Sequence, residues 1–350
     1  MCDFSSYGGP SEDWLAVAAT LPPPPVMELL ELRRVTNEGR EAVAAEAMKH
    51  LASQVLTRDH LIRTRDGGTV EARSYRPADV PETEQLPVYI HLHGGGFLFG
   101  TLAAEDATCS RIAIKSRVVV LNVNYRHTPE FTYPTAWHDV QDAFEWTHSH
   151  IRDIGGDHNK VVVGGISAGA WLTASLALEQ HLGRVATNRP AIAGQILIIP
   201  CLASMDCYGP QLAQMKDVSV SSYTENEHAP VLPMKTMRLF TDLLKIQNPE
   251  VDDTKLNPGN ASAEQVKGLP PTVFGIAGLD PLRDEGLLYA KKLTEAGVPT
   301  DINLFKGVPH GFRRYGDKLS ESARWDKVME DGIQWALSGP SPTFKFDVKT

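Results

Sequence analysis

The spacing of apolar residues changes near residue 56 of the chain. Residues 27–55 carry apolar side chains at helical spacing among good helix formers, which predicts one or two helices, broken near Asn37 and Gly39. The four prolines at 22–25, just before this stretch, are stiff and extended and cannot be part of a helix.

Short apolar runs separated by turns make up the chain from about residue 56 onward. The first two, 55–63 and 69–76, flank an Asp-Gly-Gly turn at 66–68, which is a hairpin signal. Five later runs are rich in β-branched residues and too short for core helices, namely 88–92, 118–121, 161–163, 196–199 and 273–276. Such runs are typical of strands buried on both faces, as in a parallel sheet.

Helical patterns alternate with these predicted strands. We expect helices at about 103–116, 136–152, 168–182, 284–296 and 321–338. Alternating strands and helices predict an α/β fold, in which a mostly parallel central sheet is flanked by helices and the crossovers are right-handed.

One connection is much longer than the others. More than seventy residues separate Ile199 from Thr272, and connections of that length are usually functional or form a subdomain. We predict a helix at about 232–246 there and interpret the stretch as a lid that packs with the N-terminal helices. The chain then divides into an N-terminal cap segment at 1–55, a catalytic domain at 56–203 and 249–350, and a cap insertion at 204–248.

A candidate nucleophile lies between the run at 161–163 and the helix at 168–182. The sequence Gly-Ile-Ser-Ala-Gly at 165–169 occupies this turn, as a nucleophile elbow requires. A sharp turn strains the backbone of Ser167 and raises its hydroxyl above the sheet, while the two glycines let the strand and the helix approach closely. A plain turn of small residues is the alternative, and the strand before it and the helix after it favour the elbow.

A glycine-rich loop follows the run at 88–92. Its sequence is His-Gly-Gly-Gly at 93–96. Backbone N–H groups that are fixed before the reaction begins are the best donors to the oxyanion of an acyl-transfer intermediate, and we expect Gly94, Gly95 and Ala168 to supply them. A flexible loop or a phosphate-binding turn is the alternative, but the loop lacks the Lys-Ser/Thr pair and the spaced glycines of phosphate sites.

The acid and the base are expected in two later loops. Asp280 comes just beyond a predicted strand, which places it on the same rim of the sheet as Ser167. There it can orient a histidine and stabilise the imidazolium. Asp284 is the rival carboxylate, although it can equally cap the next helix or hold the loop. His310 follows the last predicted strand, 301–305, so that serine, aspartate and histidine occur in that order along the chain.

His91 and His93 raise the question of a metal site. No third ligand lies near them in the sequence, so histidines that hold a loop are the preferred interpretation. We expect no metal and no cofactor, because a serine mechanism needs neither.

Charge and cysteine content narrow the choice of partners. With 34 Lys and Arg against 43 Asp and Glu, the net charge is −9, which repels nucleic acids and anionic membranes. The four cysteines are typical of free thiols in a reducing compartment. No secretory signal and no membrane span are expected. We therefore expect a cytoplasmic protein that binds a small-molecule ester, without nucleic acid or stable membrane insertion; assembly as a homodimer is left open.

Five motifs together give the chain a family resemblance. They are the glycine-rich loop with Phe97, Asn124-Tyr125-Arg126 with Pro129-Glu130 and Pro134, the elbow at 165–169, the acid segment at 280–284, and His310-Gly311-Phe312. In this order they resemble the hormone-sensitive-lipase-like branch of the α/β-hydrolases, over about 86–335. The resemblance implies an α/β-hydrolase fold, carboxylesterase activity, a split helical cap and no cofactor.

Ile166 departs from the pattern of that family, which usually has Asp, Glu or Thr before the nucleophile; Ala170 also stands where Gly is usual. A polar neighbour of Ile166, for example on the segment with Asp284, must then find another partner. If apolar neighbours have adapted, an aspartate at 166 should destabilise the protein. If the polar partners are still present, it should be tolerated.

The expected function is a serine carboxylic ester hydrolase that acts through an acyl-enzyme on a small to medium apolar ester. Phe97, Phe99, Trp171 and Phe312 are candidates for an apolar pocket under the cap, and a core role for each is an equal alternative. A natural-product tailoring hydrolase with the same triad, for thioester release, deacetylation, lactone opening or cyclisation, stays open. A receptor of the same fold without turnover is disfavoured by the presence of His310.

Overall fold

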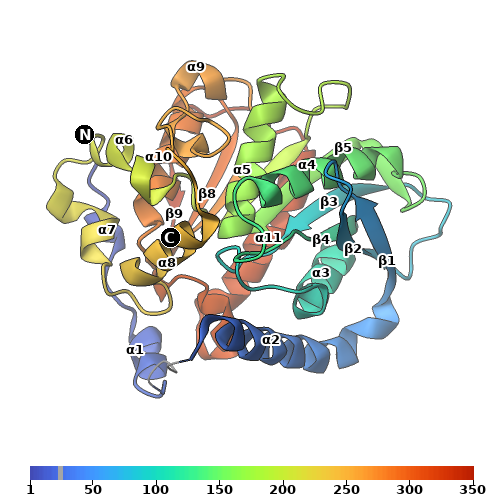
Figure 1. Cartoon of the computed structure of the whole chain (residues 1–350), viewed down its shortest axis with the longest axis horizontal. Helices are drawn as coiled ribbons and strands as arrows, with labels where there is room; N and C mark the ends of the chain where they lie inside the picture. Colours follow the sequence, from blue (N-terminus) through green and yellow to red (C-terminus); the bar gives the residue numbers. More distant parts are fainter. Residues whose placement is uncertain (23–26) are drawn as a thin grey trace.

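A single twisted sheet runs through the molecule (Figure 1). The computed structural model describes residues 1–22 and 27–350, so the predicted proline stretch lies mostly outside the described residues. Within that part, nine strands occur in the spatial order β1-β2-β4-β3-β5-β6-β7-β8-β9. They are β1 (Val55–Arg63), β2 (Thr69–Pro77), β3 (Leu86–Leu92), β4 (Val119–Asn124), β5 (Gly156–Ile166), β6 (Gly194–Ile198), β7 (Thr272–Leu279), β8 (Thr300–Pro309) and β9 (Val348–Lys349).

The direction of the strands confirms the prediction of a mostly parallel sheet. β1 and β2 form the predicted antiparallel hairpin, and β2 pairs antiparallel with β4. All further pairs, from β4 and β3 across to β8 and β9, are parallel. The residues of β4, β6 and β7 are almost all buried, as their unbroken apolar runs require of strands that are covered on both faces.

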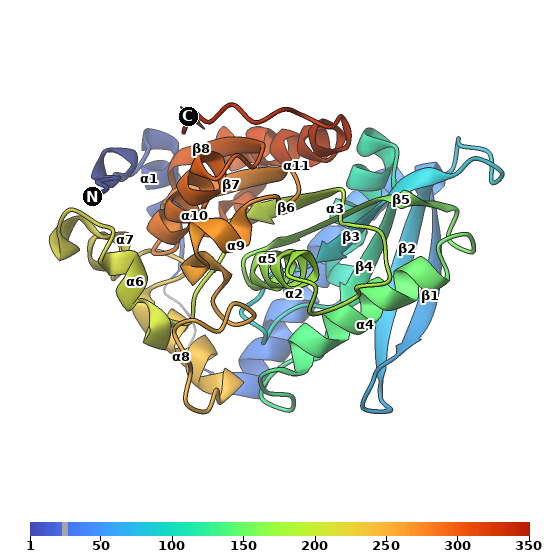
Figure 2. The same ribbon diagram turned by 90° about the horizontal axis from the view of Figure 1, so that it is seen from above.

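Helices cover both faces of the sheet (Figure 2). Neighbouring residues of β5 point to opposite faces, so that Val163 packs against α4 and α5, whereas Val162 packs against α3 and α11. The helices of the first face are α4 (Thr135–Ser149), α5 (Ala168–His181) and α10 (Arg283–Glu295), and those of the second are α3 (Leu102–Ser116) and α11 (Glu321–Leu337). All five predicted helices are confirmed, and their ends differ from the prediction by at most three residues.

The N-terminal helix is longer and simpler than the sequence pattern suggests. The break expected near Asn37 and Gly39 is wrong, because α2 runs unbroken over Leu29–Leu51. The Asn37 side chain does not compete with the helix backbone, since its Oδ1 accepts a hydrogen bond from the N–H of Gly100 at 3.0 Å. Gly39 is exposed and its cost of about 1 kcal/mol is too small to end a long helix.

The long connection between β6 and β7 consists of short helices, including α6 (Gly209–Leu212), α7 (Ser222–Glu225), α8 (Met234–Leu244) and α9 (Ala263–Val266). α8 confirms the helix expected at about 232–246. The N-terminus of the chain lies against this connection, because Cys2 pairs with Met215 in a parallel bridge. Segments from the two parts expected to form a cap are therefore in contact with one another.

Candidate active site

Ser167 lies at the turn between β5 and α5, in a strained backbone conformation. Its φ of 56° and ψ of −117° are unusual for a residue with a side chain. The glycines on either side explain how the turn closes. A Cβ atom at Gly169 would collide with the carbonyl oxygen of Leu92, and one at Gly165 would collide with the backbone of Gly169. Strand, turn and helix therefore pack against each other as a nucleophile elbow does.

His310 lies at the end of β8, between the hydroxyl of Ser167 and the carboxylate of Asp280. Its Nε2 is 2.9 Å from Ser167 Oγ, and its Nδ1 is 2.7 Å from Asp280 Oδ2. With the proton on Nδ1 donated to the carboxylate, Nε2 is the acceptor for the serine O–H. Three loops that are far apart in the sequence thus meet in the hydrogen-bond order Ser–His–Asp.

The carboxylate of Asp280 is fixed on both oxygens. Oδ2 faces His310, and Oδ1 accepts the backbone N–H of Leu282 at 3.0 Å. The residue is almost fully buried. The side chain of Asn226, from the end of α7, donates to the backbone oxygen of Asp280 at 3.3 Å. The sequence offered no signal for Asn226, because it lies in a segment without a recognisable motif.

Asp284, the rival carboxylate, is engaged elsewhere. Its Oδ2 accepts the backbone N–H of Ser222 at 2.6 Å, and its Oδ1 accepts Arg283 Nε at 2.9 Å. Arg283 in turn bonds Glu225 of α7 at 2.8 Å. Asp284 therefore ties α10 to the insertion, which is the loop-holding alternative that its position in the sequence left open. Asp284 thus has Ser222 and Arg283 as hydrogen-bond partners and needs no polar side chain at position 166.

The glycine-rich loop passes directly over the elbow. A side chain at Gly94 would press against the carbonyl oxygen of Ile166. Gly95 has a φ of 144° and accepts the N–H of Phe99 at 3.0 Å, which fixes the course of the loop. Over the residues that the structure describes, no acceptor takes the N–H of Gly94 or Gly95. These two donors, beside the N-terminal residue of α5, Ala168, are thus free for a ligand oxygen.

His91 and His93 lie beneath this loop and hold it. His91 Nε2 is 3.0 Å from a Glu105 oxygen. The ring of His93 stacks on Tyr125 at 4.4 Å, and the Tyr125 hydroxyl donates to the backbone oxygen of His93 at 2.7 Å. Burial lowers the pKa of His93 to about 4, so the ring is neutral at ordinary pH. No cluster of three or more metal-binding side chains occurs among the described residues.

The four aromatic candidates divide into two groups. Phe97, Trp171 and Phe312 lie in the core and are almost inaccessible. Phe97 stacks on Trp137, and Phe312 is packed against Phe305 and Trp325. For these three, the burial favours the core role, which the sequence left open beside a place in an apolar pocket under the cap.

Phe99 is half-buried and contacts both of the segments that are expected to form a cap. Its ring centroid is 6.1 Å from that of Phe240 in α8 and 5.6 Å from the guanidinium carbon of Arg40 in α2. Phe240 also lies against Gly96, where a side chain would collide with its ring. α2 and α8 therefore both reach the glycine-rich loop beside Phe99.

An apolar cluster in the insertion extends from this point to the acid loop. We call it the cap cluster. Its buried members are Leu232, Met237 and Leu282, with Cys201, Met205, Tyr223, Met234 and Phe240 partly buried around them. Leu282 belongs to the loop of Asp280, so the cluster joins the insertion to the triad. Apart from the helical pattern of α8, no feature of the sequence indicates this cluster.

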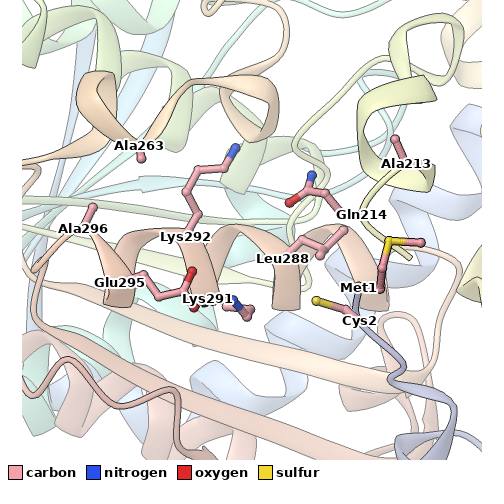
Figure 3. Close-up of a pocket in the computed structure, with 10 residues that line it drawn as sticks. All are labelled: Met1, Cys2, Ala213, Gln214, Ala263, Leu288, Lys291, Lys292, Glu295 and Ala296. Carbon is pink, nitrogen blue, oxygen red and sulfur yellow. Dashed lines mark hydrogen bonds and ion pairs between the residues drawn. The ribbon is translucent and has the colours of Figure 1, made fainter. Parts of the chain in front are cut away.

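A hollow lies away from Ser167, Asp280 and His310. It measures about 420 Å³ and is bordered by the N-terminus, α6, α9 and the C-terminal half of α10 (Figure 3). Lys292 enters it, but its Nζ donates to the carbonyl oxygens of Gly259 and Ala261 at 2.7 and 2.6 Å. Burial lowers the pKa of Lys292 to about 8. The ammonium thus anchors a loop, and none of the residues that border the hollow belongs to the triad.

Comparison with known proteins agrees with this geometry. A family model described as the alpha/beta hydrolase fold matches residues 89–314, which contain the glycine-rich loop, Ser167, Asp280 and His310. The chain belongs to this α/β-hydrolase family. The hydrolase is 34% identical over 253 residues to the carboxylesterase NlhH of Mycobacterium tuberculosis, a match that covers 71% of this chain and 72% of that protein.

Two solved structures resemble the hydrolase over nearly its whole length. Vibralactone cyclase superimposes with a TM-score of 0.84 and 27% identity, over 97% of both chains. A bacterial heroin esterase superimposes with a TM-score of 0.80 and 28% identity, over 95% of this chain and 99% of its own. The hydrolase is thus a carboxylesterase-type enzyme with the predicted fold. In the part of the chain that the structure describes, no helix has the length and apolar character needed to cross a membrane.

Proposed function

We propose that Ser167, His310 and Asp280 form the catalytic triad of a serine carboxylesterase. The observation that carries this proposal is the continuous hydrogen-bonded path from Ser167 Oγ through both ring nitrogens of His310 to Asp280. Ser167 attacks the ester carbonyl while His310 takes its proton. The alcohol leaves with that proton, and water then releases the acid from the acyl-enzyme by the same route. Asp280 keeps the tautomer and stabilises the imidazolium.

Oxyanion stabilisation is assigned to the N–H groups of Gly94, Gly95 and Ala168. The first two have no other acceptor among the described residues. Ala168 opens α5, so its N–H is one of the helix donors without an intrahelical partner. Donors that are already fixed in direction need no reorganisation when charge develops on the oxygen, and each such donor is worth about 10²–10³-fold in rate.

The finer placement within the family is the hormone-sensitive-lipase-like branch. It is supported by the five motifs and by the roles that the structure gives to Tyr125 and Arg126. The Tyr125 hydroxyl holds the glycine-rich loop, and Arg126 bonds the buried Asp139 at 2.6 Å. In this placement, residues 1–55 and 204–248 form the cap over a catalytic domain at 56–203 and 249–350. The contacts of Phe99 with both α2 and α8 support that division.

The substrate is expected to be a small to medium ester with an apolar part. The cap cluster supports this expectation, because it presents methionine, leucine and aromatic side chains next to the loop of Asp280. A natural-product tailoring reaction with the same triad is the second candidate function. It is favoured by the similarity to vibralactone cyclase, which extends over the cap as well as the catalytic domain.

A fluorophosphonate probe and a short ester test the proposed function together. We expect the purified wild-type protein to be labelled once per chain and to hydrolyse p-nitrophenyl butyrate. Ser167→Ala should lose the label and at least about 10⁴-fold of the turnover, with the same thermal unfolding as the wild type. Labelling of Ser167→Ala, or more than trace turnover by it, would show that another residue is the nucleophile.

The remaining expectations concern the surroundings of the enzyme. A cytoplasmic location is part of the proposal and is supported by the cysteine content. A homodimer is compatible with the proposal but not required by it, because the triad is complete within one chain. Activity should survive prolonged dialysis against EDTA, because no step of the mechanism uses a metal.

A further inference from the structure

Two arginine side chains lie beside the proposed catalytic groups. Arg40 of α2 reaches the glycine-rich loop, where its Nη1 is 3.4 Å from the carbonyl oxygen of Gly94. Arg314 lies in the 3-10 turn at Phe312–Lys318, and its Nε donates to the carbonyl oxygen of Gly311 at 3.1 Å. Gly94 is an oxyanion-loop residue and Gly311 directly follows His310. Both guanidinium groups are therefore held against backbone segments that carry proposed catalytic groups.

Neither arginine has a carboxylate partner, although an arginine nearby in the sequence of each one does. Arg33, two turns earlier on α2, pairs with Glu130 at 2.7 Å, and Arg313 pairs with Asp326 at 2.7 Å. Over the described residues, no Asp or Glu oxygen lies within 4.0 Å of Arg40 or Arg314. The two positive charges at the site are thus left without an ion pair, in a chain whose net charge is −9.

Glu105 is the acid that acts on the charge of Arg40, but it is not an ion-pair partner of Arg40. Glu105 lowers the energy of the Arg40 charge from a distance, but its own carboxylate is bonded to His91 at 3.0 Å. Near Arg314, the groups that act on its charge are Arg40 and Tyr315, and neither is an acid at neutral pH. An anion bound to both guanidinium groups would therefore relieve the repulsion that Arg40 exerts on Arg314.

The guanidinium of Arg314 lies close to Gly311, where an added Cβ atom would be 3.0 Å from its Nη2. The side chain is accessible to solvent, yet protein surrounds it closely enough that the loss of water lowers its pKa to about 10, with the nearby charge of Arg40 lowering it further. Arg40 is half-buried, and desolvation lowers its pKa as well. Partly desolvated charges interact more strongly with each other than charges on an open surface.

We propose that Arg40 and Arg314 bind a carboxylate of the substrate, so that the preferred substrates are esters carrying a second, anionic group. A guanidinium has five N–H donors, and the bonds to Gly94 and Gly311 use one on each side chain. The remaining donors match the two oxygens of a carboxylate. The inference rests on the proposed function and adds to it a substrate with an apolar body and one negative charge.

Two pairs of esters test the arginine site, each pair differing only in charge. The acyl-side pair is 4-nitrophenyl hydrogen adipate and its methyl ester, and the alcohol-side pair is 4-acetoxybenzoate and its methyl ester. In wild-type enzyme at low ionic strength, we expect kcat/KM for the anionic member of one pair to exceed that of the neutral member about tenfold or more. The pair that shows the preference identifies the side of the ester that carries the carboxylate.

Substitution of the arginines should remove that preference. Arg40→Gln and Arg314→Gln should each lower the ratio of kcat/KM for the preferred anionic ester to that for its neutral partner by about tenfold or more. Arg63→Gln is the matched control, because Arg63 is exposed on β1 and the substitution makes the same change in net charge. It should alter neither member of the pair.

The outcomes that would overturn the inference are distinct from those that concern the triad. Equal kcat/KM within both pairs for the wild type would overturn the arginine site and leave the esterase intact. Equal losses on anionic and neutral esters in the two variants would overturn it as well. The wild-type comparison needs no variant, so it decides even when a variant folds poorly. No turnover of any of the four esters, with no fluorophosphonate label, would overturn the proposed function itself.

Discussion

Ser167 and Arg40 reach the same glycine-rich loop, but the segments that carry them are held by different contacts. α5, which follows Ser167, buries every residue from Ala168 to Glu179 between the sheet and its neighbours. α2, which carries Arg40, buries a single described residue, Ala44. Burial of apolar surface is worth about 25 cal/mol per Å² and has no preferred direction, so α5 is held strongly along its whole length.

α2 is held instead by a few polar contacts on one face. Asn37 accepts from Gly100 N at 3.0 Å, Glu41 accepts from Thr101 Oγ1 at 2.6 Å, and Arg33 pairs with Glu130 at 2.7 Å. Net contributions of such bonds are about 0.5–1.5 kcal/mol each. The helix behind Ser167 is thus part of the core, whereas α2, which belongs to the proposed cap, is attached to the core and can change with little cost to the fold.

The largest expected effect tests the rim itself. Asp280→Asn should lower kcat by about 10⁴-fold, because the amide no longer fixes the tautomer of His310 or stabilises its imidazolium. Asp284→Asn is the matched control. It should act mainly on thermal unfolding, through the bonds to Ser222 and Arg283. Steady-state kinetics of the two variants decides, and a larger kcat loss in Asp284→Asn would reverse the assignment of the acid.

A charge at position 166 tests whether the rim tolerates polarity. Ile166 pairs in register with Ile198 and packs against the apolar core beneath the elbow. Ile166→Asp should therefore lower the free energy of unfolding by about 3 kcal/mol, whereas Ile166→Val should change it by about 1 kcal/mol. Thermal unfolding and p-nitrophenyl butyrate kinetics are the measurements. An unchanged melting temperature with a higher kcat/KM in Ile166→Asp would show that polar partners have been kept.

The contact between α2 and the glycine-rich loop is tested at Asn37. Asn37→Ala leaves the buried N–H of Gly100 without its acceptor, which should cost about 1–2 kcal/mol locally. We expect kcat/KM to fall about tenfold with little change in melting temperature, since α2 contributes little to the core. Glu38→Ala is the matched control, because Glu38 is exposed and bonds Arg34 of the same helix; it should have no effect on kcat/KM. A large fall in melting temperature for Asn37→Ala would mean that the cap is part of the folding core.

The smallest expected effect concerns acid stability and belongs to the α/β domain. Burial lowers the pKa of His148 to about 4, against about 6.5 in the unfolded chain. Its neutral form therefore favours folding fully above about pH 6.5, and that contribution is lost as the pH falls toward 4. Between pH 7 and 5, His148→Gln should lose about 1 kcal/mol less stability than the wild type. The exposed His228→Gln should follow the wild type, and equal slopes for all three would contradict the assignment.

Much of the site followed from the sequence because its signals are local. The strand before Ser167 and the helix after it, the glycines at 94–96, and the order of Ser167, Asp280 and His310 can be recognised within short segments. Continuous apolar runs predicted a parallel sheet, since a strand covered on both faces has no polar side to display. The carboxyl ends of parallel strands meet at one rim, so these segments had to converge.

Tertiary structure alone decided which side chains found partners. Asp280 and Asp284 differ by one helical turn in sequence, yet only contacts with His310 and with Ser222, 30 and 62 positions away, assign them different tasks. Likewise Arg33 and Arg40 share one helix. Arg33 meets the carboxylate of Glu130, whereas Arg40 meets the backbone oxygen of Gly94. Local patterns determine the backbone path, because hydrogen bonding and burial repeat with short periods. Long-range pairing of charges has no such period, so it could be known only once the chain was folded.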